Sequence, residues 1–138
     1  MEGRDNMKKT FCIIGLVLCA VLVGYLSLYF VCTTPFNDGS FELSDYSDCI
    51  DDPNFQDDKN YGEITNYKTA AKIGNEIFAE RFEESKSSLF LWRGCAVKYD
   101  SNNSAWYVRT FIIAPVFGGA HDVIISSNGD VLAVWGEK

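Results

Sequence analysis

The chain has 138 residues and a net charge of −7, which provides for one small domain and excludes a large multidomain protein. The charge is uneven, because residues 33–62 hold eight acids and one lysine while residues 63–138 are nearly neutral. A nucleic-acid-binding domain needs a basic face, and the composition offers none. We therefore expect no nucleic-acid partner.

The N-terminal region predicts a transmembrane anchor at residues 11–32, which read FCIIGLVLCAVLVGYLSLYFVC without one charge. At about 1.5 Å per residue, this run matches the roughly 30 Å hydrocarbon core of a bilayer. Arg4, Lys8 and Lys9 precede it and acids follow it, so we expect a single-pass membrane protein with residues 1–10 in the cytoplasm and the C-terminal domain outside. A cleaved signal peptide is the alternative, although its apolar region is normally shorter.

Residues 33–62 predict an acidic spacer. Low apolar content and dense like charge are typical of a poorly ordered chain. The aromatic side chains of Phe36, Phe41, Tyr46 and Phe55 are exceptions, and some of them could dock on the domain that follows. The simplest interpretation is a solvated chain; the alternative is an acidic strip that meets a basic partner.

No catalytic or metal-binding pattern is recognisable by spacing, so we expect neither an enzyme nor a cofactor. The five cysteines lack metal-ligand spacing, and Cys49 could instead form a disulfide with Cys95 in an oxidising compartment. The chain has one histidine, His121, which we interpret as a surface or edge residue. Asp100 and Asp122 adjoin turns and are expected to be solvated.

Residues 63–138 predict the folded domain, which begins with an amphipathic helix from the N-cap Asn66 to Phe82. Strands are expected at residues 89–99, 105–113, 121–126 and 130–135. Gly94 is a candidate bulge, and Asn128-Gly129 is typical of a type I′ hairpin turn. In the strand at 105–113, side chains alternate between two faces, and the face with Trp106 and Val108 is expected in the core. The helix is the expected cover of the sheet, so the fold class is α+β, with one long helix on a curved antiparallel sheet of three to four strands.

The stretch 65–138 also resembles a known family. It contains TNYKTAAKIGNEIF, AWYV and FGGAHDVIISSNGDVLAV in that order and ends in a lysine. These segments are similar to the short form of the nuclear-transport-factor-2 fold immunity proteins of bacterial polymorphic toxin systems. The resemblance implies a cystatin-like or nuclear-transport-factor-2-like fold and a non-enzymatic inhibitor that binds a cognate toxin protein.

A protein-binding surface is the functional site that we expect, because aromatic and arginine side chains are the usual anchors of protein interfaces. The candidate contact residues are Trp92, Arg93, Arg109, His121 and Trp135. Two other functions remain open at this stage. The domain could be a membrane-tethered ligand-binding or scaffold module of the envelope, or an enzyme built on the same fold.

Overall fold

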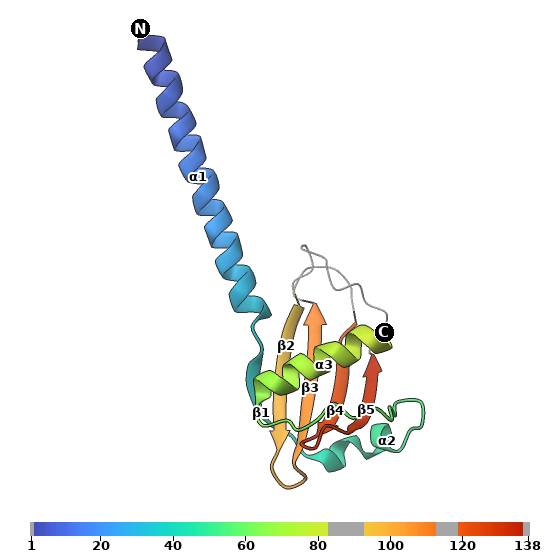
Figure 1. The fold of residues 1–138 in the computed structure, drawn as a ribbon. Helices are drawn as coiled ribbons and strands as arrows, with labels where there is room; N and C mark the ends of the chain where they lie inside the picture. Colours follow the sequence, from blue (N-terminus) through green and yellow to red (C-terminus); the bar gives the residue numbers. More distant parts are fainter. Residues whose placement is uncertain (1, 83–92, 113–118, 137–138) are drawn as a thin grey trace. The chain divides into compact units, whose positions relative to one another are not determined.

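A computed structural model describes residues 2–82, 93–112 and 119–136 (Figure 1). The chain divides into two units, residues 1–32 and 33–138. The second unit is α+β, as expected. The elements are α1 (Glu2–Thr33), β1 (Phe36–Ser40), the 3-10 turn η1 (Leu43–Tyr46), α2 (Ser47–Ile50), α3 (Tyr67–Arg81), β2 (Arg93–Asp100), β3 (Ala105–Ile112), β4 (His121–Ser126) and β5 (Val131–Gly136).

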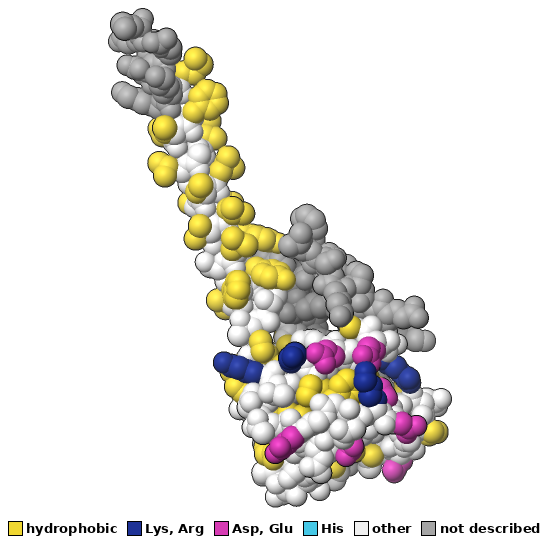
Figure 2. Space-filling model, viewed as in Figure 1, with side chains coloured by type: hydrophobic (Ala, Val, Ile, Leu, Met, Phe, Trp, Pro, Cys, Tyr) yellow, Lys and Arg dark blue, Asp and Glu magenta, His cyan; other side chains and the backbone are white. Residues whose placement is uncertain are grey.

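The first unit is the long helix α1. Its residues Thr10–Thr33 are long and apolar enough to cross a membrane, by length and composition. Figure 2 shows hydrophobic side chains along the described part of this helix. A water-soluble surface helix would show a polar face. Length and composition therefore agree with the expected anchor, while its orientation stays a prediction.

The second unit contains an open five-stranded mixed sheet in the order β1-β2-β3-β4-β5. Strands β2 to β5 form an antiparallel meander, and β1 pairs with β2 in parallel. The expectation of three to four strands in a purely antiparallel sheet was therefore wrong by one strand. The additional strand comes from residues 36–40, inside the segment expected to be a spacer. Gly94 lies in regular register with Phe111, so it does not form the expected bulge.

Helix α3 lies across one face of the sheet (Figure 1), which we call the helix face. Asn66 caps the helix, because its side-chain oxygen accepts hydrogen bonds from the backbone N–H groups of Lys68 and Thr69, both at 3.0 Å. Gly74 allows a close approach to β3, since a Cβ there would lie 2.8 Å from Cγ1 of Val108. The predicted apolar positions are buried in this layer: Ala70, Ile73, Gly74, Ile77 and Phe78 from the helix, and Val97, Val108, Val123 and Ile125 from the strands.

The opposite face of the sheet is covered by residues 41–55, which we call the cover. This corrects two expectations, that α3 alone covers the sheet and that residues 33–62 form a poorly ordered spacer. The cover is acidic on its outside, but its apolar side chains point onto the sheet. Phe41, Leu43, Tyr46 and Ile50 pack with Ala105, Tyr107, Ile124, Leu132 and Trp135.

Backbone bonds fix both ends of the cover. At one end, the N–H of Leu43 donates to a carboxylate oxygen of Asp100 at 2.8 Å. At the other end, the N–H of Val134 donates to the carbonyl oxygen of Phe55 at 2.7 Å. The second bond also uses a donor on the outer edge of β5, and paired edges resist unwanted strand addition. The cover is thus an integral layer of the domain.

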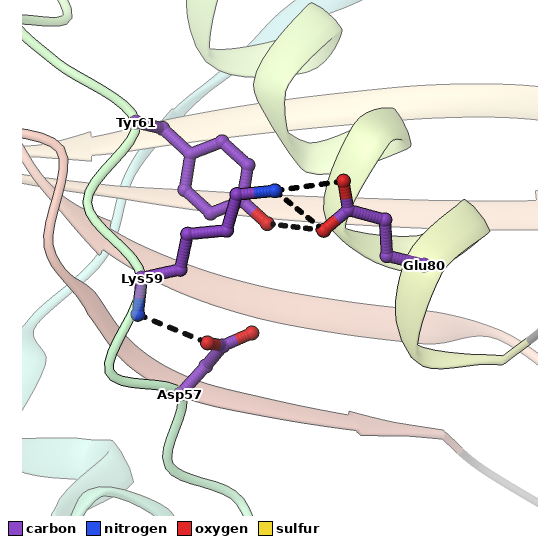
Figure 3. A network of polar contacts seen from close by, with 4 residues as sticks. All are labelled: Asp57, Lys59, Tyr61 and Glu80. Atoms are coloured by element: carbon purple, nitrogen blue, oxygen red, sulfur yellow. Dashed lines mark hydrogen bonds and ion pairs between the residues drawn. The ribbon is translucent and has the colours of Figure 1, made fainter.

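The chain between the cover and α3 is held by a small polar network (Figure 3). The ammonium of Lys59 lies 2.8 Å from both carboxylate oxygens of Glu80, and the hydroxyl of Tyr61 donates to the same carboxylate at 3.0 Å. The N–H of Lys59 donates to Asp57 at 3.0 Å. Exposed pairs of this kind contribute little to stability, so the network positions the segment more than it stabilises the domain.

Asp100 is buried, with 3% of its surface exposed, and this corrects the expectation that it is solvated. Its carboxylate accepts hydrogen bonds from the N–H groups of Leu43 and Asn102 at 2.8 Å, from the N–H of Asn103 at 3.2 Å and from the side-chain amide of Asn103 at 2.8 Å. The bond from the Asn103 side chain, followed by the backbone bonds, lowers the pKa of Asp100. The charged carboxylate therefore joins the β2–β3 turn to the cover.

Replacing Asp100 by asparagine is expected to lower the free energy of unfolding by about 1–2 kcal/mol, because an amide cannot accept all of these bonds. The lowered pKa of Asp100 also makes its contribution pH-dependent: it is present above the unfolded pKa and is lost as the pH falls through the lower folded pKa. Urea unfolding at neutral and acidic pH measures both effects. The control is the exposed Asp58→Asn, which should change stability by less than about 0.5 kcal/mol; equal losses in the two variants would contradict the role of Asp100.

The β4–β5 turn differs from the expected type I′ hairpin. Among the described residues of this turn, only Gly129 has a positive φ, +90°, whereas a type I′ turn requires two such residues. The N–H of Gly129 donates to the carbonyl of Ser126, and the strand register shifts next to the turn. The connection is therefore a three-residue loop that ends in a glycine bulge.

Cys49 and Cys95 are both free, so the structure does not contain the disulfide considered for them. Cys95 points into the core on the helix face, where burial raises the pKa of its thiol to about 12. Cys49 lies in α2, which belongs to the cover, and burial together with the nearby Asp48 raises the pKa of its thiol. The sheet separates the two sulfur atoms.

Candidate functional site

Two of the expected contact residues, Arg109 and Trp135, lie in one row on the covered face of the sheet, on either side of Asp122. In the strand register, Arg109 of β3 lies opposite Asp122 of β4, and Asp122 lies opposite Trp135 of β5. Side chains directly opposite each other on one face are close enough to interact. Tyr107 is on the same face, two residues from Arg109. We call Tyr107, Arg109, Asp122 and Trp135 the Asp122 cluster.

Asp122 was expected to be solvated, and this was wrong, because its exposed fraction is 0%. The hydroxyl of Tyr107 donates to Oδ1 of Asp122 at 2.5 Å, and Nη1 of Arg109 lies 3.7 Å from the same oxygen. A buried carboxylate is costly unless hydrogen bonds and a positive charge compensate it. The burial of Asp122 could not be predicted from its position beside a turn, because its partners Tyr107 and Arg109 come from the neighbouring strand β3.

Burial, and next the hydrogen bond to Asp122, raise the pKa of Tyr107. The phenol therefore keeps its proton and remains a donor to the carboxylate throughout the physiological range. The side chain of Arg109 is 37% exposed, so the cluster reaches the surface through the guanidinium. The charged end of the cluster is thus accessible and the carboxylate is not.

Replacing Tyr107 by phenylalanine is expected to lower the free energy of unfolding by about 1–2 kcal/mol, because Asp122 loses a buried donor. The matched control is Tyr99→Phe. Tyr99 keeps its ring contact with Trp106, and its hydroxyl makes no hydrogen bond within the described part of the chain. Urea unfolding should separate the two variants; a Tyr107→Phe loss no larger than that of Tyr99→Phe would show that the bond to Asp122 contributes nothing.

The other predicted contact residues do not join this cluster. His121 is next to Asp122 in sequence, but strand alternation turns it to the helix face. Its ring stacks there on that of Phe82, with 4.2 Å between the ring centroids. Arg93 begins β2, and its side chain lies outside the described residues. Trp92 also lies outside them. The structure therefore brings together two of the five candidates, Arg109 and Trp135, and leaves His121 on the opposite face.

The cover surrounds the cluster with aromatic rings on its inner side and carries acids on its outer side. The ring of Tyr46 lies 5.2 Å from that of Tyr107 and 6.0 Å from that of Trp135, and the ring of Phe55 lies 6.2 Å from that of Trp135. The outside of the cover and the chain after it carry exposed acids: Glu42, Asp45, Asp48, Asp51 and Asp58. The cover, which carries these acids, thus overlies Tyr107 and Trp135 of the cluster.

Within residues 2–82, 93–112 and 119–136, no group of three or more His, Cys, Asp or Glu side chains is arranged to hold a metal ion. The arrangement instead offers contact chemistry, with aromatic rings, one partly exposed guanidinium and ordered carboxylates. Comparison with known proteins finds no matching family model, no matching curated protein and no matching solved structure.

Proposed function

We propose that this protein is a membrane-anchored immunity protein that binds and neutralises a cognate bacterial toxin. The observation that carries the proposal is an apolar helix of membrane-spanning length joined directly to an ordered α+β domain. The resemblance of residues 65–138 to immunity proteins supplies the functional class. The helix holds the inhibitor in the membrane, where it can meet a toxin that acts in or passes through the cell envelope.

The positions of the resembling residues support this proposal at the level of the fold. Ala70, Val108, Val123 and Ile125 are buried together on the helix face, and Gly129 makes the turn between β4 and β5. They are residues that determine a helix-on-sheet core. A family with such a core can vary its surface to fit different partners, so we look for the contacts with the toxin outside this set.

The Asp122 cluster favours binding over catalysis. A general base must reach the proton that it removes, either directly or through one water. Oδ1 of Asp122 is instead directed at Tyr107 and Arg109, inside the domain. Arg109 and Trp135, together with the acidic outside of the cover, are chemically suited to contact a protein partner, because arginine and tryptophan are frequent hot-spot residues.

The test is co-expression of the full chain with the protein encoded by the neighbouring gene. The host is a bacterium that the neighbouring gene product kills when it is expressed alone. We expect the chain to restore growth and to co-purify with the toxin from detergent extracts. Trp135→Ala should weaken binding at least tenfold more than the matched control Tyr46→Ala, which truncates a ring of the same aromatic layer, and the exposed Glu63→Ala should bind normally. If no neighbouring gene product binds, or if the chain captures an envelope assembly protein instead, the immunity function is wrong; the latter result would favour the scaffold module.

A further inference from the structure

The two units of the chain are joined by a very short segment. Helix α1 ends at Thr33 and strand β1 begins at Phe36, so only Thr34 and Pro35 lie between them. Strand β1 is already part of the sheet, since Phe36 pairs with Ala96 of β2. Because the acidic segment belongs to the domain, it cannot serve as a flexible tether between the domain and the anchor.

Chain geometry limits how far Phe36 can be from the bilayer. The 24 residues of Thr10–Thr33 rise about 36 Å as a helix, slightly more than the roughly 30 Å hydrocarbon core. Three residue steps separate Thr33 from Phe36, which is at most about 11 Å of chain. The headgroup region on each side is roughly 5–8 Å thick. If the helix spans the membrane with its excess length divided equally between the two sides, the start of β1 lies at most about 14 Å beyond the hydrocarbon core. Phe36 is therefore within reach of the headgroup region, whatever the angle between the two units.

Phe36 has the chemistry that suits this location. Its side chain is 45% exposed, and among the described residues it is the one exposed large hydrophobic side chain outside α1. A single exposed phenylalanine is ordinary on a protein surface in water. Here it follows the apolar helix by three residues, within reach of the depth where aromatic side chains concentrate in membrane proteins. An exposed ring in this position is suited to contact with lipid.

We infer that the domain docks on the lipid headgroup layer through Phe36 at the start of β1. This inference rests on the membrane anchoring in the proposed function. It restricts the toxin to one that comes within reach of the domain at the bilayer surface. It also gives β1, which is polar and exposed along its length, a role as the strand that fixes the sheet to the membrane.

The experiment uses the full chain in phosphatidylcholine vesicles whose acyl chains are brominated close to the headgroup. Phe36→Trp adds one indole, and the difference from the unchanged chain reports that indole alone. The matched control is Asn102→Trp, at an exposed position in the β2–β3 turn. Because β1 runs parallel to β2 from Ala96 toward Tyr99, this turn is roughly 15–20 Å from Phe36 along the sheet.

We expect the added emission at position 36 to be quenched at least about twofold more strongly than that at position 102, because bromine quenches at short range and the interface holds aromatic rings. Equal quenching, or stronger quenching at position 102, would overturn the inference. Alkaline extraction of the same vesicles separates this failure from failure of the anchor. A chain released by alkali would refute membrane anchoring, whereas a retained chain with an unquenched Phe36→Trp indole would refute only the docking through Phe36.

Discussion

Replacing Tyr46 by alanine is expected to lower the free energy of unfolding of the domain by about 2–3 kcal/mol. Tyr46 is at the centre of the aromatic layer between the cover and the sheet, with ring contacts to Phe41, Tyr107 and Trp135. Truncation removes buried apolar area and three ring pairs and leaves a cavity. Urea unfolding of the full chain in detergent micelles, followed by tryptophan fluorescence, measures the loss.

The control for Tyr46 comes from the same turn of the cover. Ser44 is exposed and takes no part in the aromatic layer, so Ser44→Ala should change stability by less than about 0.5 kcal/mol. If Tyr46→Ala were as stable as Ser44→Ala, the cover would not contribute to the fold. Residues 41–55 would then be a chain resting on a domain that is complete without them.

The second large effect is expected at Gly129, where alanine should lower the free energy of unfolding by about 3 kcal/mol. The backbone there has a φ of +90°, which strains any residue with a Cβ by roughly 1–2 kcal/mol. The added Cβ would also lie 2.2 Å from the carbonyl oxygen of Gly62. That neighbour is backbone, and it is held in place because the N–H of Tyr61 donates to the carbonyl of Gly129.

Gly39 offers a matched control for the steric part of this prediction. Its φ is +96°, nearly the same as that of Gly129, but a Cβ at Gly39 would have no neighbour within 4 Å. Gly39→Ala should therefore cost only the conformational part, about 1–2 kcal/mol. Thermal unfolding of both variants gives the difference; identical losses would mean that the segment at Gly62 does not pack on the β4–β5 turn.

The helix face of the domain was predictable because its pattern is periodic. The apolar positions of α3 recur every three or four residues, and Asn66 marks its start. Two-residue alternation placed Trp106 and Val108 on one face of β3 and Arg109 on the other, as the structure confirms. Strand β4 was predicted to within its observed bounds, since turn residues flank it on the C-terminal side.

The sequence left open that aromatic side chains of residues 33–62 dock on the domain, but it did not predict the cover as a layer or β1 as a strand, for different physical reasons. In the cover, the apolar side chains of Phe41, Leu43, Tyr46, Ile50 and Phe55 follow neither the helix nor the strand period, and the same segment holds as many acids. In β1, the sequence FNDGS has weak strand propensity. Its pairing depends on the free edge of β2, which is distant in sequence. Both segments are ordered by tertiary contacts that no local pattern encodes.

Only part of the candidate site could be predicted from the sequence, because the rest also depends on tertiary contacts. Arg109 and Trp135 were selected by residue type, and the strand register then placed them on one row. Asp122, which joins them, was assigned to solvent because it adjoins a turn. Its burial depends on Tyr107 in the neighbouring strand and on the cover above, and neither contact follows from the residues beside it.

Both proposals depend on one structural claim, that the acidic segment is a layer of the domain and no tether. Hydrogen exchange of the full chain in detergent micelles tests it directly. The amides of Leu43 and Val134, whose acceptors are Asp100 and Phe55, should exchange nearly as slowly as those of β3. Fast exchange at Leu43 and Val134 and throughout residues 41–55, with β2, β3 and β4 still protected, would contradict the account.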